Sequence, residues 1–296
     1  FDTGKKRNEK MIGPVALLKD LVRINTTNPP GEEEKLLLYL ERILQEHRIP
    51  YVYQKSAKGR GNLLAWQLAD QAEEAPLILM SHTDVVAAQA SQWKFPPFEA
   101  QEVDGYIYGR GTVDTKQLTA MELTAFLALK EKEIPLKRDV YFLATSDEES
   151  GSAYGLQWFL DHEITVGETT KTGRELFRGS DVISEGGGFP VVGGKREFSL
   201  CESGQKSCGT VEFTVKAKSA KGAFFTSGDG MERAMGLAED IGKQKLDGRV
   251  LDTVKQFEQK LAGVQLSPMM QKILTAMKQN SMTVTMITGK NVNEVT

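Results

Sequence analysis

Short apolar runs alternate with stretches of helical spacing through the first two thirds of the chain. A run that is apolar throughout is typical of a strand covered on both faces, and apolar residues three and four apart are typical of a helix. We predict strands at 51–53, 62–66, 76–80, 139–145 and 181–184, and helices at 14–24, 32–46, 118–131 and 156–162. Strands that alternate with helices over residues 14–190 predict an α/β domain with a mostly parallel sheet flanked by helices.

The pattern changes near residue 208, after a stretch rich in glycine and serine. Beyond it, residues 210–216 and 282–287 alternate between apolar and polar positions, which favours half-exposed strands. Helical spacing predicts one helix at 231–244 and one or two more between 246 and 279. We therefore predict two domains, one over 1–208 and a smaller α/β domain over 209–296.

Three short polar segments border the predicted strands of the first domain. They are Ser81–Asp84, Gly109–Lys116 and Ser146–Glu149, and Glu185 follows the strand at 181–184. In an open α/β sheet, ligands bind beyond the carboxyl ends of the strands. We therefore expect all of these polar residues to meet at one edge of the sheet.

Each of these residues has an ordinary explanation when it is taken singly. His82 reads as a surface histidine, Glu148 and Glu149 as an acidic helix start, and Glu185 as a solvated carboxylate. Together they supply one imidazole and several carboxylates, a donor set suited to zinc, and cobalt or manganese suits the same donors. Adjacent glutamates also let one bind a metal while the other takes a proton from water. The combination predicts a hydrolytic metal site.

Composition adds limits to this interpretation. Of 296 residues, 40% are hydrophobic and 26% are charged, and the net charge of -3 argues against a nucleic-acid partner. We expect no membrane span, because no window approaches 18 unbroken apolar residues. The basic N-terminus lacks the apolar region of a signal peptide, which favours the cytoplasm without fixing the compartment. Cys201 and Cys208 read as two thiols, with a disulfide left open.

Five motifs occur in order along the first domain. They are Ser-His-Thr-Asp-Val-Val at 81–86, Trp-x-x-x-Pro-Phe at 93–98, Asp-Gly-x-Ile-Tyr-Gly-Arg-Gly-x-x-Asp-x-Lys at 104–116, Asp-Glu-Glu-x-Gly-Ser at 147–152 and Glu-Gly-Gly-Gly at 185–188. This set resembles the aminoacylase, acetylornithine deacetylase, succinyl-diaminopimelate desuccinylase and carboxypeptidase family of dinuclear zinc metallopeptidases. The segment Asn-Thr-Thr-Asn-Pro-Pro-Gly at 25–31 fits the same family.

The resemblance implies a role for each matching residue. His82, Asp114 and Glu185 would bind one zinc ion, and Asp114 would bridge to a second zinc ion that Glu149 also binds. Asp84 would steady His82, and Glu148 would act as general base. The implied reaction is hydrolysis of an amide or peptide bond in a small peptide or an N-acyl amino acid. The alternative is a catalytically silent metal-binding or interaction protein derived from the same fold.

The resemblance also implies a ferredoxin-like lid at 209–296 that often pairs two copies into a homodimer. Two family features are missing from this sequence. No histidine follows His162, although the family takes a zinc ligand from beyond the lid. The place of the lid motif Gly-His-Ser reads Ala220–Phe225, without histidine. We therefore expect an incomplete C-terminus, either as a fragment or as the ordered part of a longer protein, with a degenerate relative as the remaining explanation.

Overall fold

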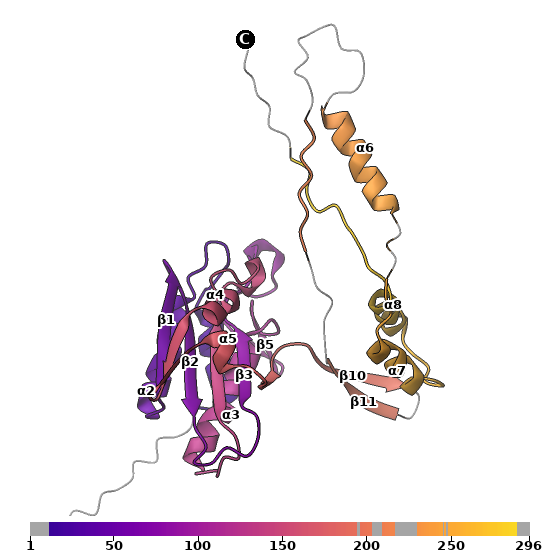
Figure 1. The fold of residues 1–296 in the computed structure, drawn as a ribbon. Coiled ribbons are helices and arrows are strands. Elements are labelled where there is room, and N and C mark those ends of the chain that lie inside the picture. The colour runs from indigo at the N-terminus through magenta and orange to yellow at the C-terminus, as the bar shows by residue number, and fades with distance from the viewer. Residues whose placement is uncertain are drawn as a thin grey trace, which may run out of the picture. The chain divides into compact units, whose positions relative to one another are not determined.

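The computed structural model describes residues 12–193, 196–202, 209–216, 230–244, 246 and 248–288. It divides into two compact units, Phe1–Glu185 and Gly186–Thr296, which are coloured in sequence order in Figure 1. The division falls before the predicted boundary at residue 208, because the hairpin of β10 (Gly187–Gly193) and β11 (Arg196–Cys201) belongs to the second unit. The roles of the two units as catalytic and lid domains stay predictions.

A five-stranded sheet forms the centre of the first unit. Its strands, in spatial order, are β1 (Tyr51–Ala57), β2 (Arg60–Gln67), β6 (Val140–Thr145), β3 (Leu77–His82) and β9 (Asp181–Ile183). β3 runs parallel to β6 and β9, whereas β2 runs antiparallel to β1 and β6. The predicted mostly parallel sheet is therefore wrong, and the sheet is mixed. Only Lys58 and Gly59 separate β1 from β2, and a two-residue connection can form only a hairpin.

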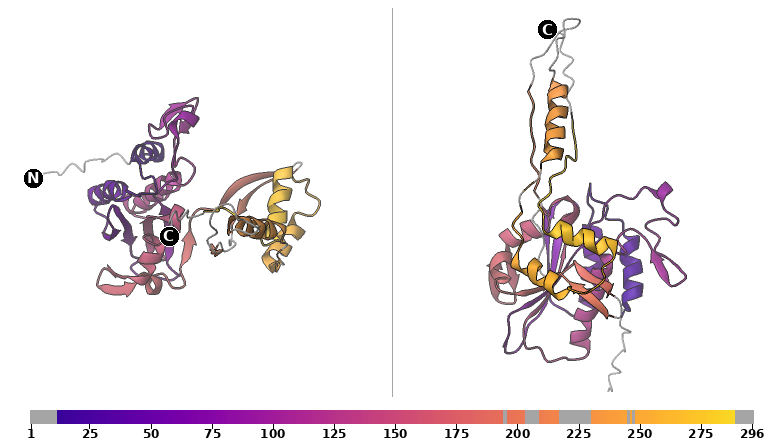
Figure 2. Two further views of the ribbon diagram at one scale, coloured as in Figure 1. Left: turned by 90° about the horizontal axis from the view of Figure 1, so that it is seen from above. Right: turned by 90° about the vertical axis from the view of Figure 1, so that its right-hand side faces the viewer.

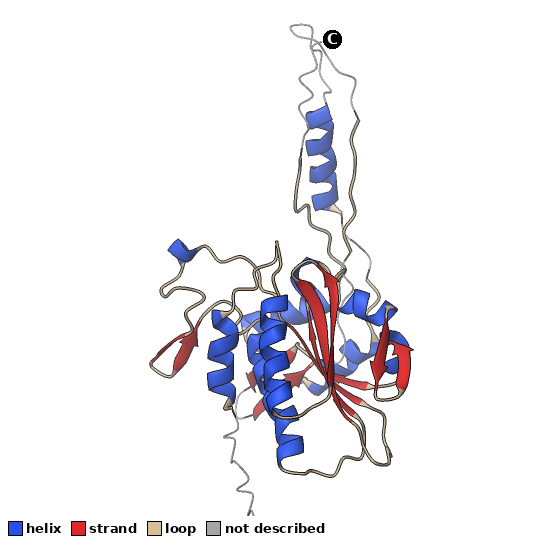
Figure 3. Ribbon diagram, turned by 90° about the vertical axis from the view of Figure 1, so that its left-hand side faces the viewer, coloured by secondary structure: helices blue, strands red, loops and turns tan. Residues whose placement is uncertain are grey.

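Helices cover one face of this sheet, and a smaller group of elements covers the other (Figure 3). The first face carries α1 (Pro14–Arg23), α2 (Glu34–Glu46) and α3 (Lys116–Glu131); the second carries α4 (Leu156–Asp161), α5 (Gly173–Leu176) and the hairpin of β7 (Glu163–Val166) and β8 (Thr169–Thr172). Side chains alternate between the faces, since Phe142 packs under α3 while its neighbours Tyr141 and Leu143 pack on the opposite side. The helices predicted in this unit are confirmed to within two residues of their ends.

A hairpin and two short 3-10 helices complete the first unit. β4 (Gln101–Val103) and β5 (Tyr106–Tyr108) meet at Asp104-Gly105, both with positive φ, as is typical of a tight hairpin. The 3-10 helices are η1 (Ala90–Gln92) and η2 (Glu148–Ser150). Among the helices of the described residues, none combines the length and apolar character needed to cross a bilayer.

The described residues of the second unit contain three further helices, α6 (Gly230–Lys243), α7 (Asp252–Lys260) and α8 (Pro268–Met277), seen from two more directions in Figure 2. These helices confirm the predicted ones. The predicted strands at 210–216 and 282–287 are wrong, because both segments lack regular structure. Alternation favours a strand only where a neighbour completes the hydrogen bonds, and no such pairing occurs among the described residues. Cys208 and Ala220–Phe225 lie outside the described residues.

Candidate metal centre

Three neighbouring parallel strands deliver most of the candidate site. His82 is the last residue of β3, η2 with Glu148 and Glu149 follows β6, and Glu185 lies two residues after β9. Since β6, β3 and β9 are adjacent and parallel, their carboxyl ends meet at one edge of the sheet. Asp114 differs from the prediction, because it lies in the loop between β5 and α3 and not at the end of a strand of this sheet.

The structure brings the other three predicted metal ligands close to the imidazole of His82. His82 Nε2 lies 3.0 Å from Asp114 Oδ1, 3.4 Å from Glu185 Oε2 and 3.9 Å from Glu148 Oε2. In each of two groups of three residues, the potential ligand atoms lie within 4.8 Å of one another. One group is His82, Asp114 and Glu149, and the other is His82, Glu148 and Glu185. Glu148, which the sequence assigns to proton transfer, therefore also lies within reach of a metal.

Asp84 holds the opposite side of the imidazole. His82 Nδ1 lies 3.0 Å from the backbone oxygen of Asp84 and 3.4 Å from its Oδ1. The carboxylate of Asp84 is fully buried and accepts hydrogen bonds from the backbone N–H groups of Glu148 (3.0 Å) and Glu149 (3.1 Å). Asp84 thus orients the imidazole through its backbone oxygen and its carboxylate, and the carboxylate also fixes η2, as partners of metal ligands commonly do.

The cluster carries more negative than positive charge. Burial disfavours the imidazolium, but the hydrogen bonds and charges of Asp84 and Glu185 outweigh it and raise the pKa of His82 to about 11. Burial and the neighbouring carboxylates raise the pKa of Glu148 and of Glu149, with His82 opposing both shifts. A divalent cation would relieve this repulsion, and it would displace the proton of His82 because only a neutral imidazole binds metal.

The residues present fit a divalent metal ion. The donors are one imidazole nitrogen and carboxylate oxygens, which suit zinc, cobalt or manganese. Oε1 of Glu149 is buried and lacks a hydrogen-bond partner within the described parts of the chain, so it is available as a ligand atom. The Asp114 side chain is 61% exposed, which leaves the cluster open on one side.

Residues to which the sequence assigned no role lie directly behind the cluster. Asn28, Glu33, Arg60 and Asp147 form a buried network that contacts Asp84. No local pattern identifies Arg60, because its partner Asp147 lies 87 positions later in the chain. Asn28 belongs to a segment that matches the family motifs, and this match is the only signal that could have selected it.

Lys116 is a second buried residue that the sequence did not assign. Its Nζ donates to the backbone oxygens of Leu21 (3.0 Å) and Ile24 (2.7 Å), so it closes the C-terminal end of α1. Burial lowers the pKa of Lys116 to about 7, with the charge of Asp84 opposing the shift.

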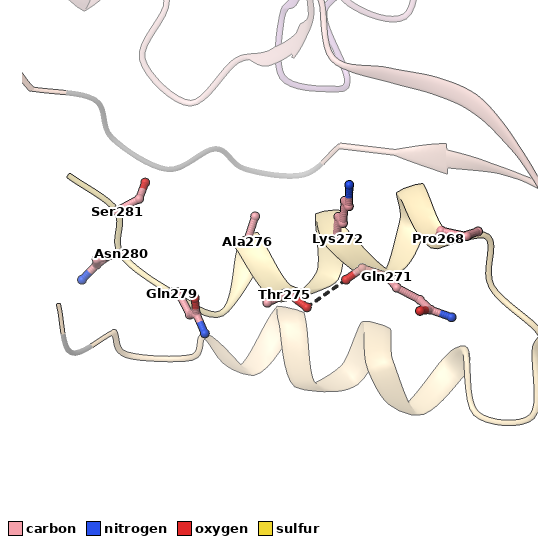
Figure 4. Close-up of a pocket in the computed structure, with 8 residues that line it drawn as sticks. All are labelled: Pro268, Gln271, Lys272, Thr275, Ala276, Gln279, Asn280 and Ser281. Carbon is pink, nitrogen blue, oxygen red and sulfur yellow. Dashed lines mark hydrogen bonds between the residues drawn. The ribbon is translucent and has the colours of Figure 1, made fainter. Parts of the chain in front are cut away.

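The second unit has a separate hollow of about 570 Å³ along α8 (Figure 4). Its lining runs from Pro268 to Ser281 and includes Lys272 but no histidine, cysteine or carboxylate. The hydrogen bond drawn in Figure 4 joins Thr275 Oγ1 to the backbone oxygen of Gln271 and belongs to the helix itself. This lining offers no ligand set for a metal.

Comparisons of this sequence with known proteins agree on one family. The sequence matches the profile described as Peptidase family M20/M25/M40 over residues 78–285. It is 34% identical over 149 residues to the probable succinyl-diaminopimelate desuccinylase of Staphylococcus epidermidis, with 50% of this chain and 35% of that protein covered. Over 81 residues it is 44% identical to an N-fatty-acyl-amino acid synthase/hydrolase of Danio rerio, with 27% of this chain and 16% of that protein covered.

A solved structure agrees with these sequence matches. The fold is similar to that of the M20 family metallo-carboxypeptidase Sso-CP2 from Sulfolobus solfataricus, with a TM-score of 0.51 and 25% sequence identity. This similarity covers 62% of this chain and 41% of that chain. The chain spans less than half the length of each of these three relatives.

Proposed function

The chain belongs to peptidase family M20/M25/M40, and from this premise we propose that it is a metal-dependent hydrolase of amide or peptide bonds. The observation that carries the proposal is the cluster of Asp114, Glu148, Glu149 and Glu185 around Nε2 of His82. The names of its relatives, a desuccinylase, an N-fatty-acyl-amino acid synthase/hydrolase and a metallo-carboxypeptidase, support a peptide or an N-acyl amino acid as substrate.

Four residues would hold the metal in this proposal. His82, Asp114 and Glu185 would hold one zinc ion, and Asp114 and Glu149 would hold a second. Asp84 would not bind the metal; it holds the imidazole through Nδ1 and leaves Nε2 facing the carboxylates of the cluster. A divalent ion held here would polarise the scissile carbonyl and lower the pKa of a water molecule.

Glu148 is the proposed general base. Its side chain is 46% exposed and reaches to 3.9 Å from His82 Nε2, so it faces the cluster while remaining accessible to solvent and substrate. Burial and nearby carboxylates raise the pKa of Glu148, which brings it closer to the pH at which a base both accepts and returns a proton. Glu148 takes the proton of the attacking water and passes it to the departing amine.

Metal titration and hydrolysis assays on the same variants test this proposal. We would measure zinc binding calorimetrically and hydrolysis of a panel of dipeptides and N-acyl amino acids. Glu148→Gln should bind zinc and lose at least 100-fold in hydrolysis, since general-base catalysis contributes about 10²–10⁴-fold. Glu149→Gln should weaken zinc binding, and the exposed Glu73→Gln should change neither property.

Two outcomes would contradict the proposal in different ways. A wild-type chain that binds zinc but hydrolyses no member of the panel would support the catalytically silent alternative. Zinc binding that survives unchanged in His82→Ala would show that the metal lies elsewhere. Pairing of two copies through residues 209–296 is a further expectation, and analytical ultracentrifugation of the chain tests it.

A further inference from the structure

Asn28 connects two buried carboxylates behind the metal cluster. Its Nδ2 donates to Asp84 Oδ2 at 2.8 Å and to Asp147 Oδ1 at 3.0 Å, and the residue is 4% exposed. A side-chain amide has two N–H donors on its nitrogen, so these two contacts use both of them. The contacts exist only while the amide nitrogen, and not the amide oxygen, points toward the carboxylates.

Arg60 determines which way this amide points. Its Nη2 donates to Asn28 Oδ1 at 2.6 Å and to the backbone oxygen of Pro30 at 2.7 Å, and the residue is 7% exposed. A guanidinium group has donors and no acceptor, so it can form a hydrogen bond with the amide oxygen of Asn28 but not with its amide nitrogen. A flipped amide would set its nitrogen against Arg60 and its oxygen against two carboxylates.

The same guanidinium also holds the segment that carries the proposed base. Arg60 Nη1 bonds Asp147, the residue immediately before Glu148, and lies 3.5 Å from Glu33 Oε1. Asp147 has a left-handed backbone (φ 66°), and its N–H donates to Glu33 Oε1 at 3.2 Å. Such a conformation persists only where its surroundings hold it.

These contacts lead to two parts of the metal cluster, the imidazole of His82 and the segment η2. Asp84 receives one hydrogen bond from Asn28 and two from the backbone of η2, and it orients His82 through Nδ1. If the Asn28 bond is lost, the Asp84 carboxylate keeps the two backbone hydrogen bonds of η2 but loses the partner that holds it from the other side, so its alignment with the imidazole is less firmly fixed. Arg60 touches no proposed ligand, so it acts only through Asn28 and Asp147.

We propose that Arg60 is a positioning residue that fixes the amide orientation of Asn28 and thereby sets the geometry of the metal ligands. This inference rests on the metal site of the proposed function. The requirement is for a planar fork and not only for positive charge, because one guanidinium serves the amide, a backbone oxygen and Asp147 at once. A lysine ammonium is a single point of charge and lacks this fork.

Zinc affinity of the 296-residue chain tests the proposal. We expect Arg60→Lys to weaken zinc binding about 10–100-fold, the usual effect of changing a residue that orients a metal ligand. Asn28→Asp, which replaces the donor nitrogen with an oxygen facing two carboxylates, should weaken it at least as much. The matched control is Arg174→Lys, an exposed arginine that also pairs with an aspartate, and it should bind zinc like the wild type.

Cobalt spectra separate positioning from a merely structural role. The visible absorption of Co²⁺ bound to the chain reports ligand geometry, so it should change in Arg60→Lys even at saturating metal. Wild-type affinity and an unchanged Co²⁺ spectrum in a folded Arg60→Lys protein would overturn the proposal.

If Arg60→Lys does not fold, Asn28→Ser carries the same test, since it removes the amide and keeps the Arg60–Asp147 pair. A wild-type chain without zinc binding would refute the proposed function, whereas equal binding by wild type and variants refutes only the positioning role.

Discussion

We expect Glu122 to lower the free energy of unfolding at neutral pH, and we expect Glu122→Gln to remove this destabilisation. The residue lies on α3 and is 4% exposed, and neither carboxylate oxygen has a hydrogen-bond partner of normal geometry among the described residues. Burial raises the pKa of Glu122 to about 8, although Ser81 and the backbone of Met80 oppose the shift. The folded protein therefore holds a proton that the unfolded chain releases.

The size of the effect follows from this difference in pKa. Below the ordinary value of 4.5 both states are protonated and Glu122 imposes no cost. Between 4.5 and about 8 the free energy of unfolding should fall by about 1.4 kcal/mol per pH unit, because only the unfolded state loses the proton. The full cost above pH 8 is about 5 kcal/mol, and at pH 7 it is about 3 kcal/mol.

Urea unfolding of metal-free protein at several pH values measures this contribution. Glutamine has nearly the same shape as glutamate and cannot ionise, so the stability gained by Glu122→Gln should be near zero at pH 4 and grow to about 3 kcal/mol at pH 7. Glu73→Gln, which changes an exposed carboxyl group, provides the control. A gain that is the same at pH 4 and pH 7, or a loss at pH 7, would refute the assignment of a protonated buried carboxyl group.

Three further substitutions or additions have defined outcomes. Gly155→Ala should destabilise the first unit by about 3 kcal/mol or more in urea unfolding, because the new Cβ would lie 1.7 Å from the backbone oxygen of Ser146. Phe126→Ala should cost about 3–5 kcal/mol in the same assay, since the ring is fully buried and packs against Phe142. Zinc at 100 times its Kd should stabilise the folded chain by about 2.7 kcal/mol, seen as a higher Tm, and His82→Ala should abolish this rise.

Much of the first unit could be predicted from local sequence pattern. The apolar runs that became β3 and β6 are strands, because burial on both faces demands apolar side chains. The run at β9 is also a strand, although its three residues are exposed. Strand direction was not in the pattern, since hydrophobic periodicity is the same for parallel and antiparallel neighbours. The antiparallel hairpin of β1 and β2 was missed because the strands predicted at 51–53 and 62–66 stop short of the two-residue connection at Lys58-Gly59.

The candidate site shows the same limit on a smaller scale. His82, Glu148 and Glu185 could be grouped from sequence because each follows a strand of the same sheet. Arg60 and Glu122 could not, because a charged residue looks solvated until its burial is known, and burial depends on contacts far away in the chain. The predicted strands at 210–216 and 282–287 failed for a related reason, since alternation does not specify a partner strand.

The candidate site combines one fixed donor with several adjustable ones. The side chain of His82 is 2% exposed and that of Asp84 is fully buried, whereas those of the proposed ligands Asp114 and Glu185 are 61% and 37% exposed. Ions of different ionic radius can therefore be accommodated by small rotations of the carboxylates while the imidazole stays in place. A cage of this kind discriminates weakly among first-row divalent ions, so the supply of metal around the protein decides which ion it carries.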